Sequence, residues 1–178
     1  MVNPDLRSWL GQVEKMEELQ CIEGADWDLE IGALSSLNGR RRSCPALLFD
    51  KIKGYPSGYR VLSCSTTTRT RLELTFNLPS SPSDMRLVQV LRGKLAEWES
   101  RLPEFPYEVV SSGPVLENVL AGKDINLFKF PVPRWHELDG GRYIGTGDAV
   151  ITRDPDTGAI NMGTYRIMVH DEKTTALY

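Results

Sequence analysis

A group of polar residues near the C-terminus could do chemistry if its members lie at one site. They are Asn161, Thr164, Tyr165 and Arg166. An amide oxygen is a neutral ligand for a hard cation, and a guanidinium binds a carboxylate in a planar fork. Side chains alternate faces along a regular strand, so Asn161 and Arg166, an odd number of positions apart, should point opposite ways. They can share one site only if the strand bulges or bends, and Gly163 is where we expect that.

The strand that must position these residues belongs to a predicted β-hairpin. Its first strand spans Tyr143 to Arg153 and its second Ala159 to Val169. The turn between them is Asp154-Pro155-Asp156-Thr157-Gly158, in which proline presets φ, aspartate bonds the local backbone and glycine allows positive φ. One alternative stays open, namely an ordinary half-exposed hairpin with scattered polar residues.

Composition limits the classes of function. The 178 residues are 40% hydrophobic and 25% charged, which is ordinary for a globular protein. The net charge of -3 offers no basic field for nucleic acid, and no apolar run is long enough to span a membrane. The three cysteines match neither a disulfide framework nor a zinc motif, and the N-terminus lacks a secretory pattern. We therefore predict a cytoplasmic protein.

A proline-containing segment divides the chain into two parts. The run Leu102-Pro103-Glu104-Phe105-Pro106 is a predicted linker between a mixed α/β half and a mostly β half. The prediction is an α+β protein with domains at 1–103 and 104–178. Three expected helices begin at Asn3, Asp26 and Arg69, and a fourth spans Ser81 to Trp98. The expected strands are Glu17 to Ile22, Pro45 to Ile52, Tyr59 to Ser65, Tyr107 to Ser112 and Thr174 to Tyr178. The run Asp124 to Pro133 is expected to be extended.

Common catalytic signatures are missing from the sequence. It has no dinucleotide-binding glycine motif, P-loop, HExxH, GxSxG or CxxC. His136, beside Trp135, is more typical of a structural residue than of a metal ligand. The run Asp139-Gly140-Gly141-Arg142 is either a tight turn or an anion-binding nest, and we favour the turn.

Longer motifs carry a resemblance. The runs WHELDGGRYIGTG, DAVITRDPDTGAINMGTYRIMV and HDEKTTALY resemble the UbiD family of decarboxylases. The resemblance covers Asp124 to Tyr178, and its most specific part is Asp139 to Tyr143 followed by Asn161-x-x-Thr164-Tyr165-Arg166. The first hundred residues resemble the family's N-terminal α/β domain in layout only. The resemblance implies that the second domain begins a split β-barrel, like that of flavin reductases, which binds a cofactor.

The resemblance also implies an activity. Members of this family reversibly decarboxylate aromatic or α,β-unsaturated carboxylic acids through a cycloadduct with prenylated FMN, and they use a divalent metal, usually Mn²⁺, and K⁺. By position, Asn161 matches the metal ligand and Arg166 the arginine that flanks the substrate carboxylate. Thr164 and Tyr165 match the segment along the flavin, as does Arg166, and Thr146 matches a threonine beside the cofactor.

In the resembled family, the remaining metal ligands, the proton-donating glutamate and an oligomerising domain lie downstream of the position of Tyr178. We therefore expect an N-terminal fragment that is inactive alone and homo-oligomeric when full length. One alternative is a non-catalytic assembly subunit, whose strand at Thr174 to Tyr178 pairs with another chain. Others are a flavin-binding module completed by another chain and an ordinary flavin-binding split barrel of the reductase type.

Overall fold

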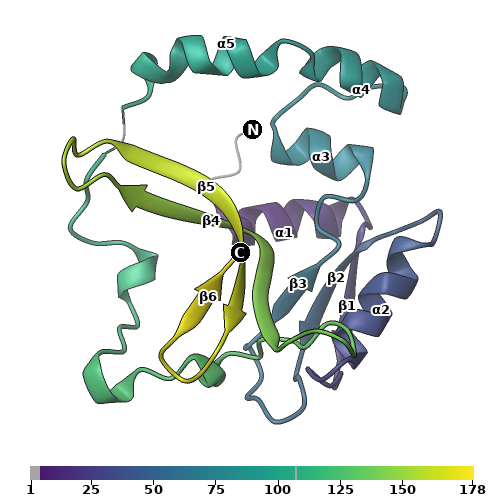
Figure 1. Ribbon diagram of the computed structural model, residues 1–178. Helices are drawn as coiled ribbons and strands as arrows, with labels where there is room; N and C mark the ends of the chain where they lie inside the picture. Colours follow the sequence, from purple (N-terminus) through teal and green to yellow (C-terminus); the bar gives the residue numbers. More distant parts are fainter. Residues whose placement is uncertain (1–4, 107) are drawn as a thin grey trace. The chain divides into compact units, whose positions relative to one another are not determined.

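A computed structural model describes residues 5–106 and 108–178 as two compact units (Figure 1). The first unit comprises the described residues up to Glu18 together with Thr66–Leu120. The second comprises Leu19–Ser65 and Ala121–Tyr178. Both units therefore combine segments that lie far apart in the sequence.

The first unit is helical. Its elements are α1 (Leu6–Lys15), α3 (Arg69–Thr75), α4 (Asp84–Leu91), α5 (Lys94–Arg101), and the short 3-10 turns η1 (Leu102–Glu104) and η2 (Pro114–Leu116). The side chains of Asp5, Thr68 and Ser83 cap the starts of α1, α3 and α4 by accepting backbone N–H hydrogen bonds. The Trp9 indole of α1 donates to the Thr75 hydroxyl over 3.1 Å, which ties α1 to α3.

The second unit contains a small sheet covered by a helix. Strand β1 (Leu19–Glu23) pairs parallel with β2 (Ala46–Asp50), which pairs antiparallel with β3 (Val61–Ser63), and α2 (Glu30–Gly39) lies between β1 and β2 in the chain. Strand β2 is buried over four of its five residues, as expected of an apolar central strand. The core of this part is formed by Ala25, Ile31, Leu47, Phe49 and Ile52.

A second sheet in the same unit carries the hairpin. Strand β4 (Arg142–Arg153) pairs antiparallel with β5 (Ile160–Val169), and β5 pairs antiparallel with β6 (Thr175–Leu177). Figure 1 shows β4 and β5 as a long ribbon that curves partway along its length. The 3-10 turns η3 (Gly122–Asp124) and η4 (Leu127–Lys129) precede it.

Several predicted elements need correction. The helix predicted from Ser81 to Trp98 is two helices, because Arg92 is extended and Gly93 adopts φ 84°. The described part of the strand predicted at Tyr107 to Ser112 is irregular, and 3-10 turns interrupt the extended run predicted from Asp124. The helix predicted to begin at Asp26 begins at Glu30.

The start of the first helix differs in a similar way. Its cap is Asp5, and the predicted start, Asn3, lies outside the described residues. The predicted domain boundary at residue 103 does not coincide with the two compact units, whose segments alternate along the chain. The boundary at residue 103 therefore stays a prediction from the sequence. In the described part of the chain, no helix has the length and apolar character needed to cross a membrane.

Candidate functional site

The turn of the hairpin is built as its sequence predicts. One carboxylate oxygen of Asp154 accepts hydrogen bonds from the backbone N–H of Asp156 and of Thr157, over 2.9 and 2.7 Å. These bonds, the Thr157 backbone bond foremost, hold the pKa of the Asp154 carboxyl below its usual range. Gly158 has φ 73°, which favours glycine. Local chemistry therefore fixes where the two strands reverse.

The five predicted site residues all lie on this hairpin and are all exposed. They are Thr146 on β4 and Asn161, Thr164, Tyr165 and Arg166 on β5. Among the residues that the structure describes, none of these side chains has a hydrogen-bond or ion-pair partner. The backbone of Arg166, in contrast, is held through both its N–H and its C=O group, since it exchanges hydrogen bonds of 2.9 and 3.0 Å with Tyr178 beyond the end of β6. The side chains are thus free for a ligand while the strand that carries them is fixed.

The predicted bulge at Gly163 is wrong, because the irregularity lies in the other strand. Strand β5 pairs without interruption from Ile160 to Tyr165, and Gly163 faces Val150. The register shifts instead in β4, between Tyr143 and Gly145 and again between Gly145 and Asp148. A signal for this was present in the sequence, since two glycines flank Thr146 within a strand.

Regular pairing decides which site residues share a face. Asn161 and Tyr165 alternate onto one face of β5 with Gly163 between them. A Cβ atom at Gly163 would collide with the Tyr165 ring, which confirms that this ring leans over Gly163. Thr164 and Arg166 belong to the opposite face. The described hairpin therefore does not bring Asn161 and Arg166 together on one face.

The bulge places Thr146 at the level of Arg166. Gly145 pairs with Ile167 and Asp148 with Tyr165, so Thr146 lies in the stretch of β4 opposite Arg166. A Cβ atom at Gly147 would lie 3.6 Å from the methyl group of Thr164, an ordinary contact. The hairpin thus offers two groups of polar side chains, Asn161 with Tyr165 and, on the other face, Thr164 with Arg166 near the bulge.

The segment before the hairpin is fixed to α2 and to the loop that precedes it. Arg134 forms a parallel bridge with Asp28, and its guanidinium donates to the Asp28 carboxylate over 2.6 Å. That hydrogen bond is the main reason why the pKa of Arg134 is raised. The indole of Trp135 donates to the Tyr143 carbonyl over 3.2 Å, and Gly32 of α2 lies against the Trp135 backbone. The base of β4 is therefore anchored within its own unit.

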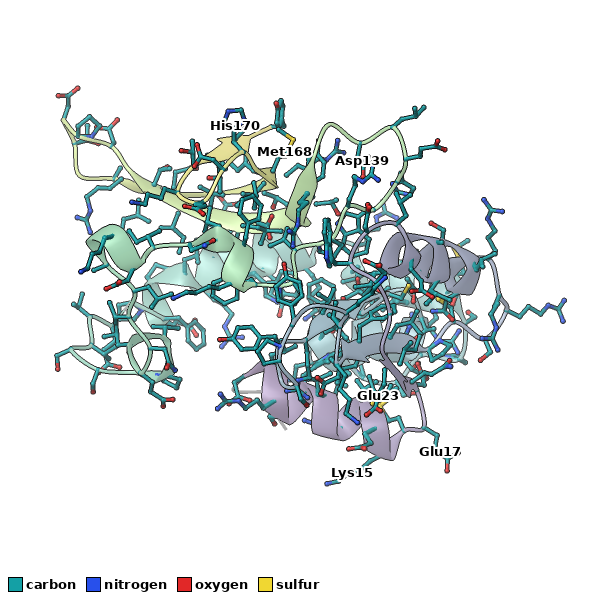
Figure 2. The ribbon with its side chains drawn as sticks, turned by 90° about the horizontal axis from the view of Figure 1, so that it is seen from below. Lys15, Glu17, Glu23, Asp139, Met168 and His170 are labelled. Carbon is teal, nitrogen blue, oxygen red and sulfur yellow. The ribbon has the colours of Figure 1, made fainter. Side chains whose placement is uncertain are left out.

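The turn favoured from the sequence at Asp139 to Arg142 lies earlier, at His136 to Asp139, and the chain then bends at Gly140 and Gly141 into β4. Asp139 accepts a 2.9 Å hydrogen bond from the backbone N–H of His136, which closes the turn. A Cβ atom at Gly141 would lie 3.1 Å from the Met168 sulfur. Figure 2 labels Asp139 and Met168, which mark this turn and the end of β5. Arg142, quoted above only as part of a motif, is the residue that the sequence analysis missed, because its contacts come from distant segments.

The side chains of the hairpin account for part of what the expected metal ion and substrate carboxylate would need. Asn161 offers one neutral oxygen ligand on the hairpin, and Arg166 offers an unpaired guanidinium for an anion. Across the described residues, no group of three or more His, Cys, Asp or Glu side chains is placed to hold a metal ion. A divalent cation takes several oxygen ligands, so Asn161 would be one member of a larger set.

Comparison with known proteins identifies the family. A family model described as the 3-octaprenyl-4-hydroxybenzoate carboxy-lyase N-terminal domain matches residues 10–91. The model of the Rift-related domain of the same carboxy-lyase matches residues 108–178, which include the whole hairpin. The chain belongs to the UbiD family. The resemblance seen in the sequence is thereby confirmed.

Individual proteins similar to this chain include decarboxylases of the same family. The chain is 33% identical over 180 residues to the pyrrole-2-carboxylic acid decarboxylase of Pseudomonas aeruginosa, covering 97% of this chain and 35% of that protein. The closed form of Sedimentibacter hydroxybenzoicus vanillic acid decarboxylase is similar with a TM-score of 0.80 and 31% identity, over 99% of this chain and 37% of that one.

A UbiD-class structure with a bound cofactor is similar as well. It is an evolved dimeric form of HmfF from Pelotomaculum thermopropionicum in complex with prFMN, with a TM-score of 0.75 and 26% identity, over 97% of this chain and 38% of that one. The chain spans just over a third of the length of each of these three proteins.

Proposed function

We propose that this chain forms the part of a UbiD-type decarboxylase that presents the β4–β5 hairpin to prenylated FMN and to an aromatic or α,β-unsaturated carboxylic acid. The observation that carries the proposal is the exposed, unpartnered set of Thr146, Asn161, Tyr165 and Arg166 within the Rift-related domain. Relatives named for pyrrole-2-carboxylic acid and vanillic acid, and one bound to prFMN, support the substrate class and the cofactor.

Each site residue has a proposed role. Arg166 pairs with the substrate carboxylate, because its guanidinium stays charged and binds carboxylate bidentately. Asn161 would supply one oxygen ligand to Mn²⁺. Thr146, Thr164 and Tyr165 line the flavin and orient it. When bound, prenylated FMN supplies the electron sink for loss of CO₂, and the protein orients substrate and cofactor.

The proposal extends to the surroundings of the hairpin. We propose that β4, β5 and β6 begin a split barrel and that K⁺ accompanies Mn²⁺. Further metal ligands and the proton donor are proposed to come from chain beyond the described residues, so that the 178 residues alone do not release CO₂. A homo-oligomer and a cytoplasmic location also stay predictions. The dimeric HmfF structure supports the oligomer.

The test uses the protein as its gene encodes it, loaded with prenylated FMN, Mn²⁺ and K⁺. We expect CO₂ release from pyrrole-2-carboxylate, vanillate or a cinnamate. Arg166→Ala should lower kcat/KM by about 1.5–3 kcal/mol, the usual value of a charged hydrogen bond, or roughly 10- to 150-fold. Asn161→Ala should lower metal occupancy, measured by metal analysis.

Arg153→Ala serves as the control, since Arg153 is exposed at the far end of β4. Full activity of the Arg166 variant would refute the role given to that residue. Flavin binding without CO₂ release from any of these acids would favour the binding-module alternative.

A further inference from the structure

Arg142, the first residue of β4, holds three chain segments together. Its guanidinium lies over the ring of Trp27, 3.9 Å from the centroid, and 5.1 Å from the centroid of Phe128. It donates to the Val132 carbonyl and to the Tyr55 hydroxyl, each over 2.6 Å. These partners come from the loops around the first sheet and from the segment that leads to the hairpin.

The chemistry of this contact requires arginine. Within the described residues Arg142 forms no ion pair, so its charge is balanced by ring faces, a carbonyl and a hydroxyl. A planar guanidinium can stack on one ring and donate in its own plane to two acceptors at once. A lysine ammonium keeps the charge but has neither the plane nor the fork. The contact is therefore directional, and it fixes the orientation of the residue that carries it.

That orientation passes directly to the site. Arg142 pairs with Val169 and Tyr143 with Met168, and the first register shift follows at once. Thr146 lies in the shifted stretch, four residues after Arg142 in the same strand. The direction in which β4 leaves its contact with Trp27 and Tyr55 therefore sets where the bulge, and the part of β5 opposite it, is presented.

We propose that Arg142 is a positioning residue for decarboxylation. It does not touch substrate or cofactor. It holds the base of the hairpin so that Thr146 and Arg166 meet them in a productive arrangement. This inference rests on the proposed function and adds a residue to it.

The test compares Arg142→Lys and Arg142→Met with Arg153→Met in the protein as its gene encodes it. Arg153 is a matched control, because it is an exposed arginine at the other end of the same strand. For Arg142→Met we expect kcat to fall roughly 10- to 100-fold with KM changed by no more than about threefold, since misplacement by about 1 Å can cost that much in rate. Arg142→Lys should recover part of the loss, and Arg153→Met should match the wild type.

A second measurement separates this inference from the proposed function. Hydrogen exchange at the amides of 144–148 and 164–167 should become faster in Arg142→Met, while exchange in α2 stays unchanged. This readout holds even if the wild type decarboxylates none of the acids tried. Unchanged hairpin exchange, a wild-type kcat in Arg142→Met, or faster exchange throughout the unit would each overturn the positioning role.

Discussion

Arg71 is fully buried, yet it carries a positive charge inside the helical unit. Its guanidinium donates to the Glu18 carboxylate over 2.5 Å and to the Thr67 hydroxyl over 2.6 Å. The hydroxyls of Thr68 and Thr70 donate to the same carboxylate over 2.8 and 2.5 Å. A buried charge of this kind is tolerated because it is paired and hydrogen-bonded.

This network makes stability depend on pH. Burial raises the pKa of the Glu18 carboxyl, but hydrogen bonds from Thr70 and Thr68 and the charge of Arg71 outweigh it and lower that pKa below its ordinary 4.5. The unfolded chain therefore takes up the proton first, and the stabilisation present above pH 4.5 is lost as pH falls through the lowered pKa.

Glu18→Gln tests this at neutral and acidic pH. Because the variant leaves Arg71 buried without its counter-charge, we expect the free energy of unfolding at pH 7 to drop by about 3 kcal/mol. The difference from wild type should shrink below pH 4.5, as followed by urea denaturation. Glu14→Gln is the control, since Glu14 is exposed on α1. An equal loss at every pH would contradict the ionic explanation.

Among the elements, those with local signals were predicted well. The turn from Asp154 to Gly158 specified the hairpin, and Ser83 caps α4 close to the predicted helix start at Ser81. Distant contacts decided the rest. Asp28 bridges to Arg134 instead of joining a helix, so α2 starts later than its sequence suggests. No local pattern could have shown that bridge.

The same limit applies to the candidate site. The residue types on β5 indicated the chemistry, but whether they share a face depends on cross-strand register. Register placed the bulge opposite Arg166 and left the stretch around Gly163 regular. The sequence of one strand does not determine the register in which it pairs with its neighbour.

Helix α2 lies very close to the segment before the hairpin, and this contact can be tested by substitution. A Cβ atom at Gly32 would collide with the Trp135 carbonyl, and backbone atoms on both sides leave little room to adjust. Gly32→Ala should therefore lower the free energy of unfolding by about 3 kcal/mol, at the upper end of overpacking costs.

Gly39→Ala in the same helix is the matched control, because nothing lies within 4 Å of its added Cβ. We expect it to be neutral or to stabilise by about 0.5 kcal/mol. Urea denaturation of both variants checks the comparison. Equal stabilities would show that α2 and Trp135 do not pack as described.

At the scale of the whole molecule, neither unit is a continuous stretch of chain. The unit with both sheets takes Leu19–Ser65 from one part of the sequence and Ala121–Tyr178 from another. Trp135, which packs on the core of the first sheet, and Arg134, which binds Asp28 in the loop beside it, come from the second part. A cut between the two predicted sequence domains would therefore remove contacts from a sheet that it leaves otherwise intact.

A chain of residues 1–103 tests this arrangement. Without Trp135 and the neighbouring contacts, its first sheet should lose roughly 3 kcal/mol, about the value of one large buried side chain. Urea unfolding followed by circular dichroism should show a lower midpoint than for all 178 residues. The same midpoint for both would show that 1–103 is energetically independent.

The bulge in β4 has a consequence for how the hairpin can vary. Between Tyr143 and Asp148 β4 has four residues, where β5 has two between Met168 and Tyr165, so the excess is two. An even excess leaves inward and outward positions in step on either side, and only the short stretch containing Thr146 is out of phase. Losing both extra residues would straighten the ribbon and keep its two faces. Losing one would leave a single bulge in β4 and change the offset at which Thr146 faces Arg166.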